Sequence, residues 1–168
     1  MSTETLKQTF TTNSTEKHPL HAETEVAYNT GDLDRWASLY EEDALLCATS
    51  GDGFVVGRQQ IRKTLERFLA LRGSLTAKTV YSVENDDLVL LRGIFTLSYT
   101  DEEAKPQQMI AHSVEVAKRG GNGLLRFIID HPVGATGAGI PSADSTSPSY
   151  KGMPRIEAIS MVVPSGAS

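Results

Sequence analysis

The sequence predicts a single α+β domain, a cone-shaped barrel in which three N-terminal helices pack on a curved antiparallel sheet. Between residues 20 and 73, apolar side chains recur every three to four positions, which is typical of amphipathic helices. Between residues 75 and 131, four segments rich in β-branched, aromatic and aliphatic residues are separated by short turns. Helices followed by a meander of strands favour an α+β domain, and we expect it to enclose an apolar small molecule.

Three helices are predicted in the first half of the chain. The first covers residues 20–29 and ends at Gly31, whose missing Cβ tolerates a left-handed conformation. Asp32 can cap the second helix, whose apolar stripe consists of Leu33, Trp36, Ala37 and Tyr40. The third helix follows Gly57 and carries Ile61, Leu65 and Phe68 on one face. A short strand at residues 44–47 is predicted between the second and third helices.

Four strands are predicted at residues 75–83, 87–99, 107–118 and 124–131. The loops between them are too short for a parallel crossover, so neighbouring strands are expected to be antiparallel. Residues 1–17 are polar and predict a flexible N-terminal segment before a domain at residues 18–133. Residues 134–168 are rich in Gly, Pro, Ser and Ala, which predicts a loosely ordered tail.

Composition excludes several classes of function. The 168-residue chain has a net charge of −5, so it lacks the concentrated basic surface that nucleic-acid binding requires. One cysteine, Cys47, cannot form an internal disulfide and suits a reducing compartment. No apolar stretch approaches the roughly 20 residues of a membrane span, and the N-terminus lacks a signal-peptide pattern. We therefore expect a cytoplasmic protein with no nucleic-acid or membrane partner.

Three blocks of residues resemble the nuclear transport factor 2-like superfamily, and within it the SnoaL-like and ketosteroid-isomerase-like branch. They are Tyr28-Asn29-Thr30-Gly31-Asp32-Leu33-Asp34, Leu39-Tyr40-Glu41-Glu42-Asp43-Ala44 and Gly57-Arg58-Gln59-Gln60-Ile61-Arg62. Arg126-Phe127-Ile128-Ile129-Asp130-His131 also resembles the closing strand of many members. The resemblance covers about residues 20–133 and implies a cone open between helices and sheet, and a homodimer packed through the sheet's outer face.

The resemblance also implies which chemistries are lost. Isomerases, dehydratases, cyclases, epoxide hydrolases and binding modules share this fold, so the fold alone does not define a function. Counting from the shared blocks, the oxyanion tyrosine of ketosteroid isomerase falls at Thr24 and its base aspartate falls at Ala48. Ile110 stands where the epoxide-hydrolase branch has an arginine. Neither steroid isomerisation by that mechanism nor that hydrolysis is expected.

His112 and Asp130 are the predicted catalytic residues. His112 is the best counterpart of the family's second oxyanion group and shares a strand face with aliphatic neighbours. A turn centred near Gly121 would set Asp130 opposite His112, where it could orient the imidazole as a general base or acid. A shift of one residue in register would bring Ile129 there instead. The alternatives are a core histidine and a turn-capping aspartate, and Glu115 is expected to project away from the site, toward a partner or solvent.

The predicted pocket wall is aromatic. Its candidates are Tyr28, Trp36, Tyr40, Phe54, Phe68 and Phe95, although aromatic residues at helical spacing also suit a plain core. Tyr28 is the helix phenol placed to donate a hydrogen bond to a ligand oxygen. The pair His18 and His21 lacks further ligands for a metal, and the glycine-rich turns do not precede helices as a phosphate-binding loop would. No cofactor or metal is therefore expected.

These observations predict a cofactor-independent enzyme of isomerase, cyclase or dehydratase type. Its substrate would be a hydrophobic carbonyl-containing metabolite held in an enclosed pocket, where protons are transferred by acid/base catalysis. The alternative is a non-catalytic small-molecule-binding or dimerisation module of the same fold. A scaffold domain whose core is filled is the third possibility.

Overall fold

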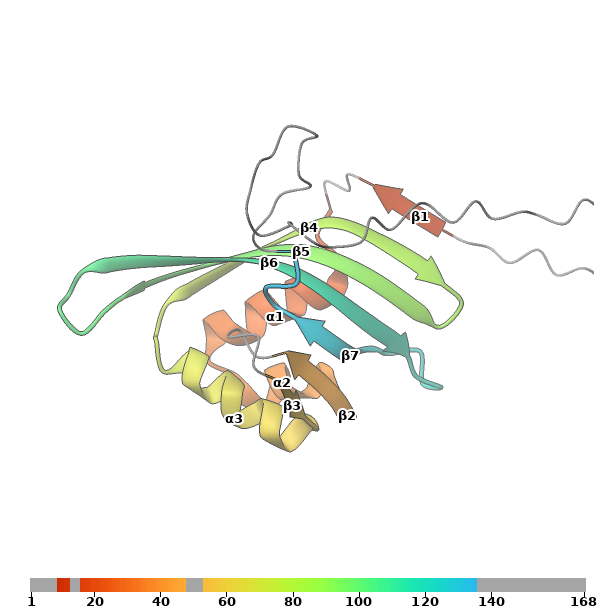
Figure 1. Ribbon diagram of the computed structural model, residues 1–168, viewed down its shortest axis with the longest axis horizontal. Coiled ribbons are helices and arrows are strands. Elements are labelled where there is room, and N and C mark those ends of the chain that lie inside the picture. Colours follow the sequence, from red (N-terminus) through yellow and green to blue (C-terminus); the bar gives the residue numbers. More distant parts are fainter. Residues whose placement is uncertain (1–8, 13–15, 48–52, 136–168) are drawn as a thin grey trace, which may run out of the picture. The chain divides into compact units, whose positions relative to one another are not determined.

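The computed structural model describes residues 9–12, 16–47 and 53–135. Its helices are α1 (Pro19–Thr30), α2 (Leu33–Ser38) and α3 (Arg58–Leu69). Its strands are β1 (Thr9–Thr12), β2 (Tyr40–Cys47), β3 (Phe54–Val56), β4 (Ser74–Asn85), β5 (Leu88–Thr100), β6 (Pro106–Arg119) and β7 (Leu125–His131). The seven described strands form one sheet in the order β1-β4-β5-β6-β7-β2-β3, and the three helices lie on one side of its curve (Figure 1). The predicted α+β class, with helices packed on a curved sheet, is confirmed.

The meander from β4 to β7 is antiparallel, as the short turns predicted. The predicted sheet was antiparallel throughout, and this is wrong at one pairing, because β2 runs parallel to β7. These two strands are far apart in the sequence, so no short loop between them restricts their direction. The sheet is therefore mixed. The predicted barrel is also wrong, because β1 and β3 are the two edges of the sheet and it does not close.

Two segments differ from the predicted elements. Tyr40, predicted at the end of the second helix, begins β2 instead, since α2 stops at Ser38. Thr9–Thr12 lies in the segment predicted to be flexible but pairs with β4 as β1. The predicted tail from residue 136 onward and the position of Ala48 lie outside the described residues.

Local capping explains where α1 begins and ends. His18 Nδ1 accepts the backbone N–H of Leu20 at 3.3 Å. It can do so because burial, and then the nearby His21 and Arg119, lower the pKa of His18 to about 4 and leave the ring uncharged at neutral pH. Gly31 ends the helix in the left-handed conformation at φ 71°, as predicted.

The hydrophobic core lies between the helices and the inner face of the sheet. It is contiguous and draws on every helix and on β2 and β4 to β7. Among its members are Ile61 and Leu65 of α3, which are almost fully buried, as their helical spacing predicted. None of the described helices is both long enough and apolar enough to cross a membrane.

Candidate active site

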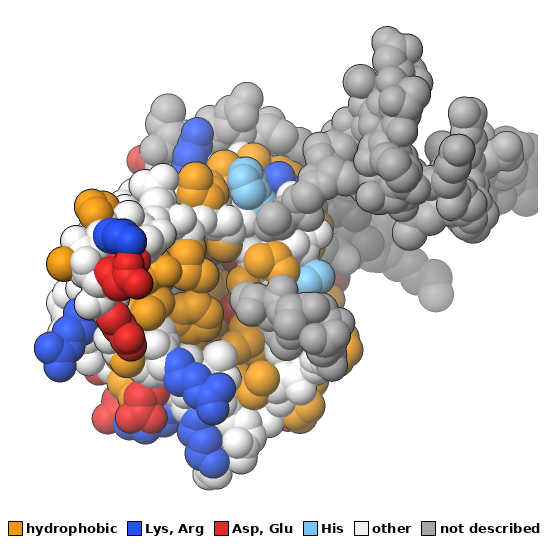
Figure 2. Space-filling model, turned by 60° about the vertical axis from the view of Figure 1, so that its left-hand side comes forward, with side chains coloured by type: hydrophobic (Ala, Val, Ile, Leu, Met, Phe, Trp, Pro, Cys, Tyr) orange, Lys and Arg blue, Asp and Glu red, His pale blue; other side chains and the backbone are white. Residues whose placement is uncertain are grey.

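A pocket opens between the helices and the inner face of the sheet. Its cavity of about 120 Å³ offers room for on the order of ten water molecules, or for a small organic molecule of similar size. The wall is mostly aromatic and aliphatic, and it comes from α1, α2, α3 and strands β2 and β4 to β7. Figure 2 shows hydrophobic side chains gathered around a hollow, with charged side chains of both signs beyond them.

The aromatic wall agrees largely with the predicted set. Of the six predicted aromatic residues, five line the pocket: Tyr28, Trp36, Tyr40, Phe68 and Phe95. Phe54 does not, because it lies on the edge strand β3 with 64% of its surface exposed. Phe127 of β7, which was not predicted, completes the wall and packs against the Tyr40 ring at 5.3 Å between centroids.

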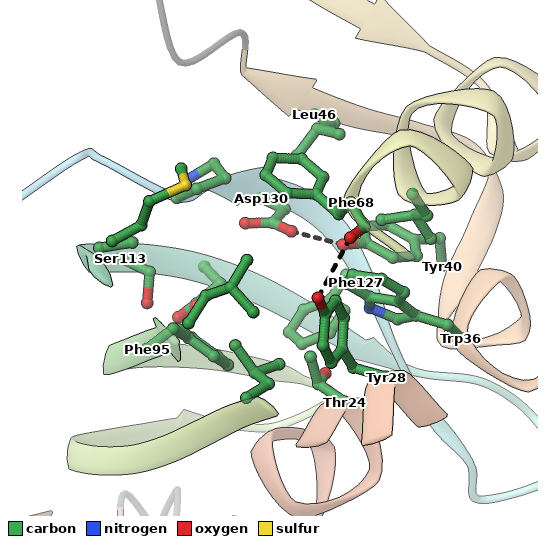
Figure 3. Close-up of a pocket in the computed structure, with 17 residues that line it drawn as sticks. Thr24, Tyr28, Trp36, Tyr40, Leu46, Phe68, Phe95, Ser113, Phe127 and Asp130 are labelled. Carbon is green, nitrogen blue, oxygen red and sulfur yellow. Dashed lines mark hydrogen bonds between the residues drawn. The ribbon is translucent and has the colours of Figure 1, made fainter. Parts of the chain in front are cut away.

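The hydroxyl of Tyr28 is already bonded within the protein. It donates to the carbonyl of Phe68 at 3.1 Å (Figure 3). It also accepts the backbone N–H of Gly73 at 3.3 Å. These bonds tie α1 to the end of α3 and the start of β4. The structure therefore gives Tyr28 a place in the pocket wall and a structural use for the phenol that was predicted to reach a ligand.

Asp130 lies in the pocket, but its predicted pairing with His112 is wrong. The residue opposite Asp130 on β6 is Glu115. The turn between β6 and β7 is centred at Asn122, and a bulge after Val116 adds a further residue of shift. Together these move the register by three positions, and an odd shift exchanges the two faces of a strand.

His112 consequently lies on the outer face of the sheet. Met109, Ala111, Ser113 and Glu115 alternate along the pocket side of β6, and His112 points the other way. Its backbone carbonyl accepts the N–H of Ala135 at 2.9 Å. The structure separates the two residues that were predicted to act together.

Asp130 and Glu115 stand opposite each other on β7 and β6 and form a buried carboxyl pair in the pocket wall. Tyr40 Oη donates a hydrogen bond to Asp130 Oδ2 at 2.5 Å (Figure 3). Burial and then the neighbouring Glu115 raise the pKa of Asp130 to about 7, against a smaller lowering by the Tyr40 hydrogen bond. Burial and the adjacent Asp130 also raise the pKa of Tyr40 well above its usual range, so Tyr40 remains a donor.

Glu115 and His21 are the site residues that the sequence reasoning missed. Glu115 is 2% exposed and His21 is fully buried. Glu115 was expected to project away from the site, and His21 was considered only as a metal ligand. Their facing atoms, His21 Nε2 and Glu115 Oε2, are 3.5 Å apart. A glutamate flanked by aliphatic residues on a strand was the available signal, because an acidic side chain inside a sheet usually has a specific partner.

Thr24, the counterpart of the lost oxyanion tyrosine, also lines the pocket. Its hydroxyl donates to the carbonyl of Leu20 at 2.9 Å, which is an ordinary bond within a helix. Within the described residues, no three His, Cys, Asp or Glu side chains come together as metal ligands would. The polar chemistry of the pocket therefore rests on the carboxyl pair and its neighbours.

Comparison with known families agrees with this geometry. The model of the SnoaL-like domain matches residues 21–140, which is most of the chain. The chain belongs to the SnoaL-like domain family. A search of curated proteins finds no match to this chain.

Solved structures share the fold of this SnoaL-like domain. A ketosteroid isomerase-like protein from Erwinia carotovora is 12% identical, with a TM-score of 0.58 over 67% of this chain and 88% of that one. An NTF-2 like protein from Shewanella oneidensis is 16% identical, with a TM-score of 0.57 over 67% and 91%. A Xanthomonas campestris protein, provisionally named a calcium/calmodulin-dependent protein kinase II association domain, is 25% identical, with a TM-score of 0.52 over 64% and 76%.

Proposed function

We propose that this SnoaL-like domain is a cofactor-independent enzyme of isomerase, cyclase or dehydratase type, acting on a hydrophobic carbonyl-containing molecule through Asp130. The observation that carries the proposal is a carboxyl group with a pKa of about 7, buried in an apolar pocket. Such a group is both a competent base and a competent acid near neutral pH, which is the condition for efficient proton transfer.

The reaction begins with the ionised Asp130 carboxylate. It removes a proton from the carbon next to the substrate carbonyl, and the electron pair of that C–H bond becomes the enolate. The protonated Asp130 then returns the same proton to another atom of the molecule, so no cofactor is consumed. Tyr40 holds the carboxyl in place through its hydrogen bond, and the apolar wall keeps water from the enolate.

The charge of the pocket restricts the substrate. Two carboxyl groups line it, and none of the described lining residues is Lys, Arg or His. A carboxylate or phosphate on the substrate would face acidic groups without a cation to offset them. We therefore assign the pocket to uncharged molecules with one reactive carbonyl group.

Hydrogen–deuterium exchange tests the proposal without knowledge of the natural substrate. The protein is incubated with α-tetralone and with 2-octanone in D₂O near neutral pH, and the loss of the α-proton signal is followed by ¹H NMR. We expect exchange faster than in buffer alone. Asp130→Asn should slow the catalysed exchange by about 100-fold or more, the usual contribution of a general base.

His112→Ala is the matched control, because His112 lies on the outer face of the same strand that carries Glu115. Its exchange rate should equal that of the wild-type protein. Equal rates for Asp130→Asn and wild type, or a loss confined to His112→Ala, would contradict the assignment of the base.

The alternative function is a non-catalytic binding module, and the hydrogen bond of the Tyr40 hydroxyl favours it. Because Tyr40 donates to Asp130, that donor is not available to an enolate oxygen. A binding module would take up α-tetralone, visible as shifts of pocket resonances, and would leave its α-protons unexchanged.

We also propose that two copies of the chain pack through the outer face of the sheet. Leu90 of β5, Val116 of β6 and Ile129 of β7 stand side by side on that face. Leu90 and Ile129 are 37% and 38% exposed, and Ile110 on the same face is 52% exposed. An apolar row across three strands is costly in water and suits a self-complementary dimer interface.

A further inference from the structure

A row of buried polar side chains runs behind the carboxyl pair, away from the pocket. It begins at Thr79 on β4, passes through His21 on α1 and reaches Glu115 on β6. Thr79 is 5% exposed, while His21 is fully buried and Glu115 nearly so. Polar groups this deep are retained only when each one has a partner.

The hydrogen atoms of this row define the orientation of the imidazole. Thr79 Oγ1 accepts the backbone N–H of His18 at 2.7 Å, and it lies 2.8 Å from His21 Nδ1. A hydroxyl can accept one hydrogen bond and donate another, so Thr79 can accept the His18 N–H and give its own proton to Nδ1. We assign the His21 proton to Nε2, because that nitrogen faces Glu115 Oε2, a buried acceptor with no other described partner.

The two atoms at the end of the row lack other partners. His21 Nε2 and Glu115 Oε2 are both buried without a hydrogen bond to any other described residue. They face one another at 3.5 Å, so each is the available partner of the other. A short movement of either side chain makes this a hydrogen bond to the carboxylate.

Gly93 on β5 has no side chain and leaves space for the imidazole of His21 beside Glu115. A Cβ at Gly93 would lie 3.0 Å from His21 Cε1 and 2.8 Å from Ser113 Oγ. The Phe95 ring closes the other side, edge to face with the imidazole at 5.2 Å between centroids. The imidazole is thus held by packing as well as by Thr79.

We propose that His21 is a positioning residue which, oriented by Thr79, holds Glu115 in its ionised form, so that the proton of the carboxyl pair resides on Asp130. This role rests on the proposed use of Asp130 as the acid and base. Without the Nε2–H donor, the pair would hold its proton on either carboxyl. Asp130 would then hold the proton less often near neutral pH, and it would return a proton to the substrate less readily.

Three titratable side chains lie near the pair, and a fourth lies beside one of them. Tyr40 from β2 donates to Asp130, and His21 from α1 faces Glu115. Cys47 lies at the end of β2, where burial and then the charge of Asp130 raise the pKa of the thiol. His18 lies next to His21, with 6.0 Å between the centroids of the two rings.

Site-resolved ¹³C NMR of the Asp and Glu carboxyl carbons tests this role on the ligand-free protein. In the wild-type protein we expect Asp130 to titrate with its midpoint near 7. In His21→Phe, the midpoint of Asp130 should fall by at least about one pH unit, a tenfold rise in its dissociation constant.

Thr79→Val removes the hydroxyl at nearly constant volume and should shift Asp130 in the same direction. If His21→Phe does not fold, the Asp130 midpoint in Thr79→Val tests the proposal by itself. His112→Phe and Thr76→Val are matched controls, because both positions lie on the outer face of the sheet, and neither should move the Asp130 midpoint.

An Asp130 midpoint that stays near its wild-type value in His21→Phe or in Thr79→Val would overturn the proposal. So would a ¹⁵N spectrum showing the His21 proton on Nδ1. The titration is independent of turnover. If no ketone exchanges its protons while the Asp130 midpoint falls in both variants, then the proposed reaction fails and the role of His21 in the pair stands.

Discussion

Asp130 is 9% exposed, and its carboxyl lies among aromatic and aliphatic side chains, next to a second carboxyl. The same environment that raises its pKa makes its ionised form costly to the folded protein. Between pH 3.8 and about 7 the folded state holds a proton that the unfolded state releases. The free energy of unfolding therefore decreases as pH rises through this window, and it levels off above it.

Replacing Asp130 with Asn should stabilise the protein at alkaline pH. The amide carries no charge and keeps an oxygen to accept the Tyr40 hydroxyl. We expect a gain of about 1–3 kcal/mol in the free energy of unfolding near pH 8, and little gain near pH 3, where Asp130 is protonated in both states. Urea denaturation at the two pH values measures it.

Asp43→Asn is the control, since this aspartate is exposed at the surface. A stabilisation of Asp130→Asn that is equal at both pH values would show that burial of the charge is not its source. Loss of proton exchange together with a gain in stability is the expected exchange of function for stability at an active site.

At the level of single residues, the sequence predicted well which side chains line the pocket. It predicted poorly which of these side chains contact each other. Five of the six aromatic wall residues and Asp130 were identified because helical and strand periodicity places side chains on faces. The partner of Asp130 was not, because a pairing depends on turn geometry and on a bulge that leaves no clear mark in the sequence.

Strands and helices were predicted with good accuracy, and the face of β6 was not. Its even-numbered positions include Ile110, Val114 and Val116, and they suggested an inner face by hydrophobicity alone. The pocket side instead carries Ser113 and Glu115. The outer face of this sheet is apolar, and its inner face carries polar residues of the pocket. In such a sheet, the alternation of side chains along a strand separates the two faces, but hydrophobicity does not indicate which of them is inside.

The glycine of β5 gives a test at the level of the strand. In Gly93→Ala the added Cβ would lie 2.8 Å from Ser113 Oγ and 2.9 Å from Phe95 Cε2. The buried neighbours must move apart, and overpacking of this kind costs about 1–3 kcal/mol. We expect a lower urea midpoint with an unchanged m-value, because the same surface is exposed on unfolding.

Gly121→Ala is the matched control, because a Cβ there has no atom within 4 Å. Its urea midpoint should stay close to that of the wild-type protein. If both alanine variants unfold at the wild-type midpoint, the space beside His21 is larger than the structure shows.

For the molecule as a whole, the order of helices and strands was sufficient to predict the class of the fold. The parallel pairing of β2 with β7 could not be derived in the same way, because it joins segments about 80 residues apart, as Leu46 and Asp130 illustrate. Long-range pairings depend on how the complete sheet curves around the helices, and no local pattern records that.

The proposed dimer is testable through the apolar row on the outer face. Ile129→Lys places a charge beside Val116 without touching the pocket, since Ile129 lies on the opposite face of β7 from Asp130. We expect the mass in solution, measured by light scattering after size exclusion, to halve relative to the wild-type protein. A charge left unpaired in an apolar interface costs several kcal/mol.

Leu124→Lys is the control, because Leu124 is an exposed residue of the turn before β7. It should leave the mass unchanged. A wild-type protein that is already monomeric, or an Ile129→Lys variant of unchanged mass, would refute an interface on this face.

The turn at residues 120–124 lies at the surface, yet together with the bulge after Val116 it determines which side chain stands beside Asp130. Adding or deleting one residue in that turn could replace Glu115 with an aliphatic neighbour and leave every pocket-lining residue in the sequence. A change of length in an exposed turn is among the mutations that proteins tolerate best. Evolution can therefore change the partner of Asp130 through insertions or deletions in a surface turn, without any substitution in the site.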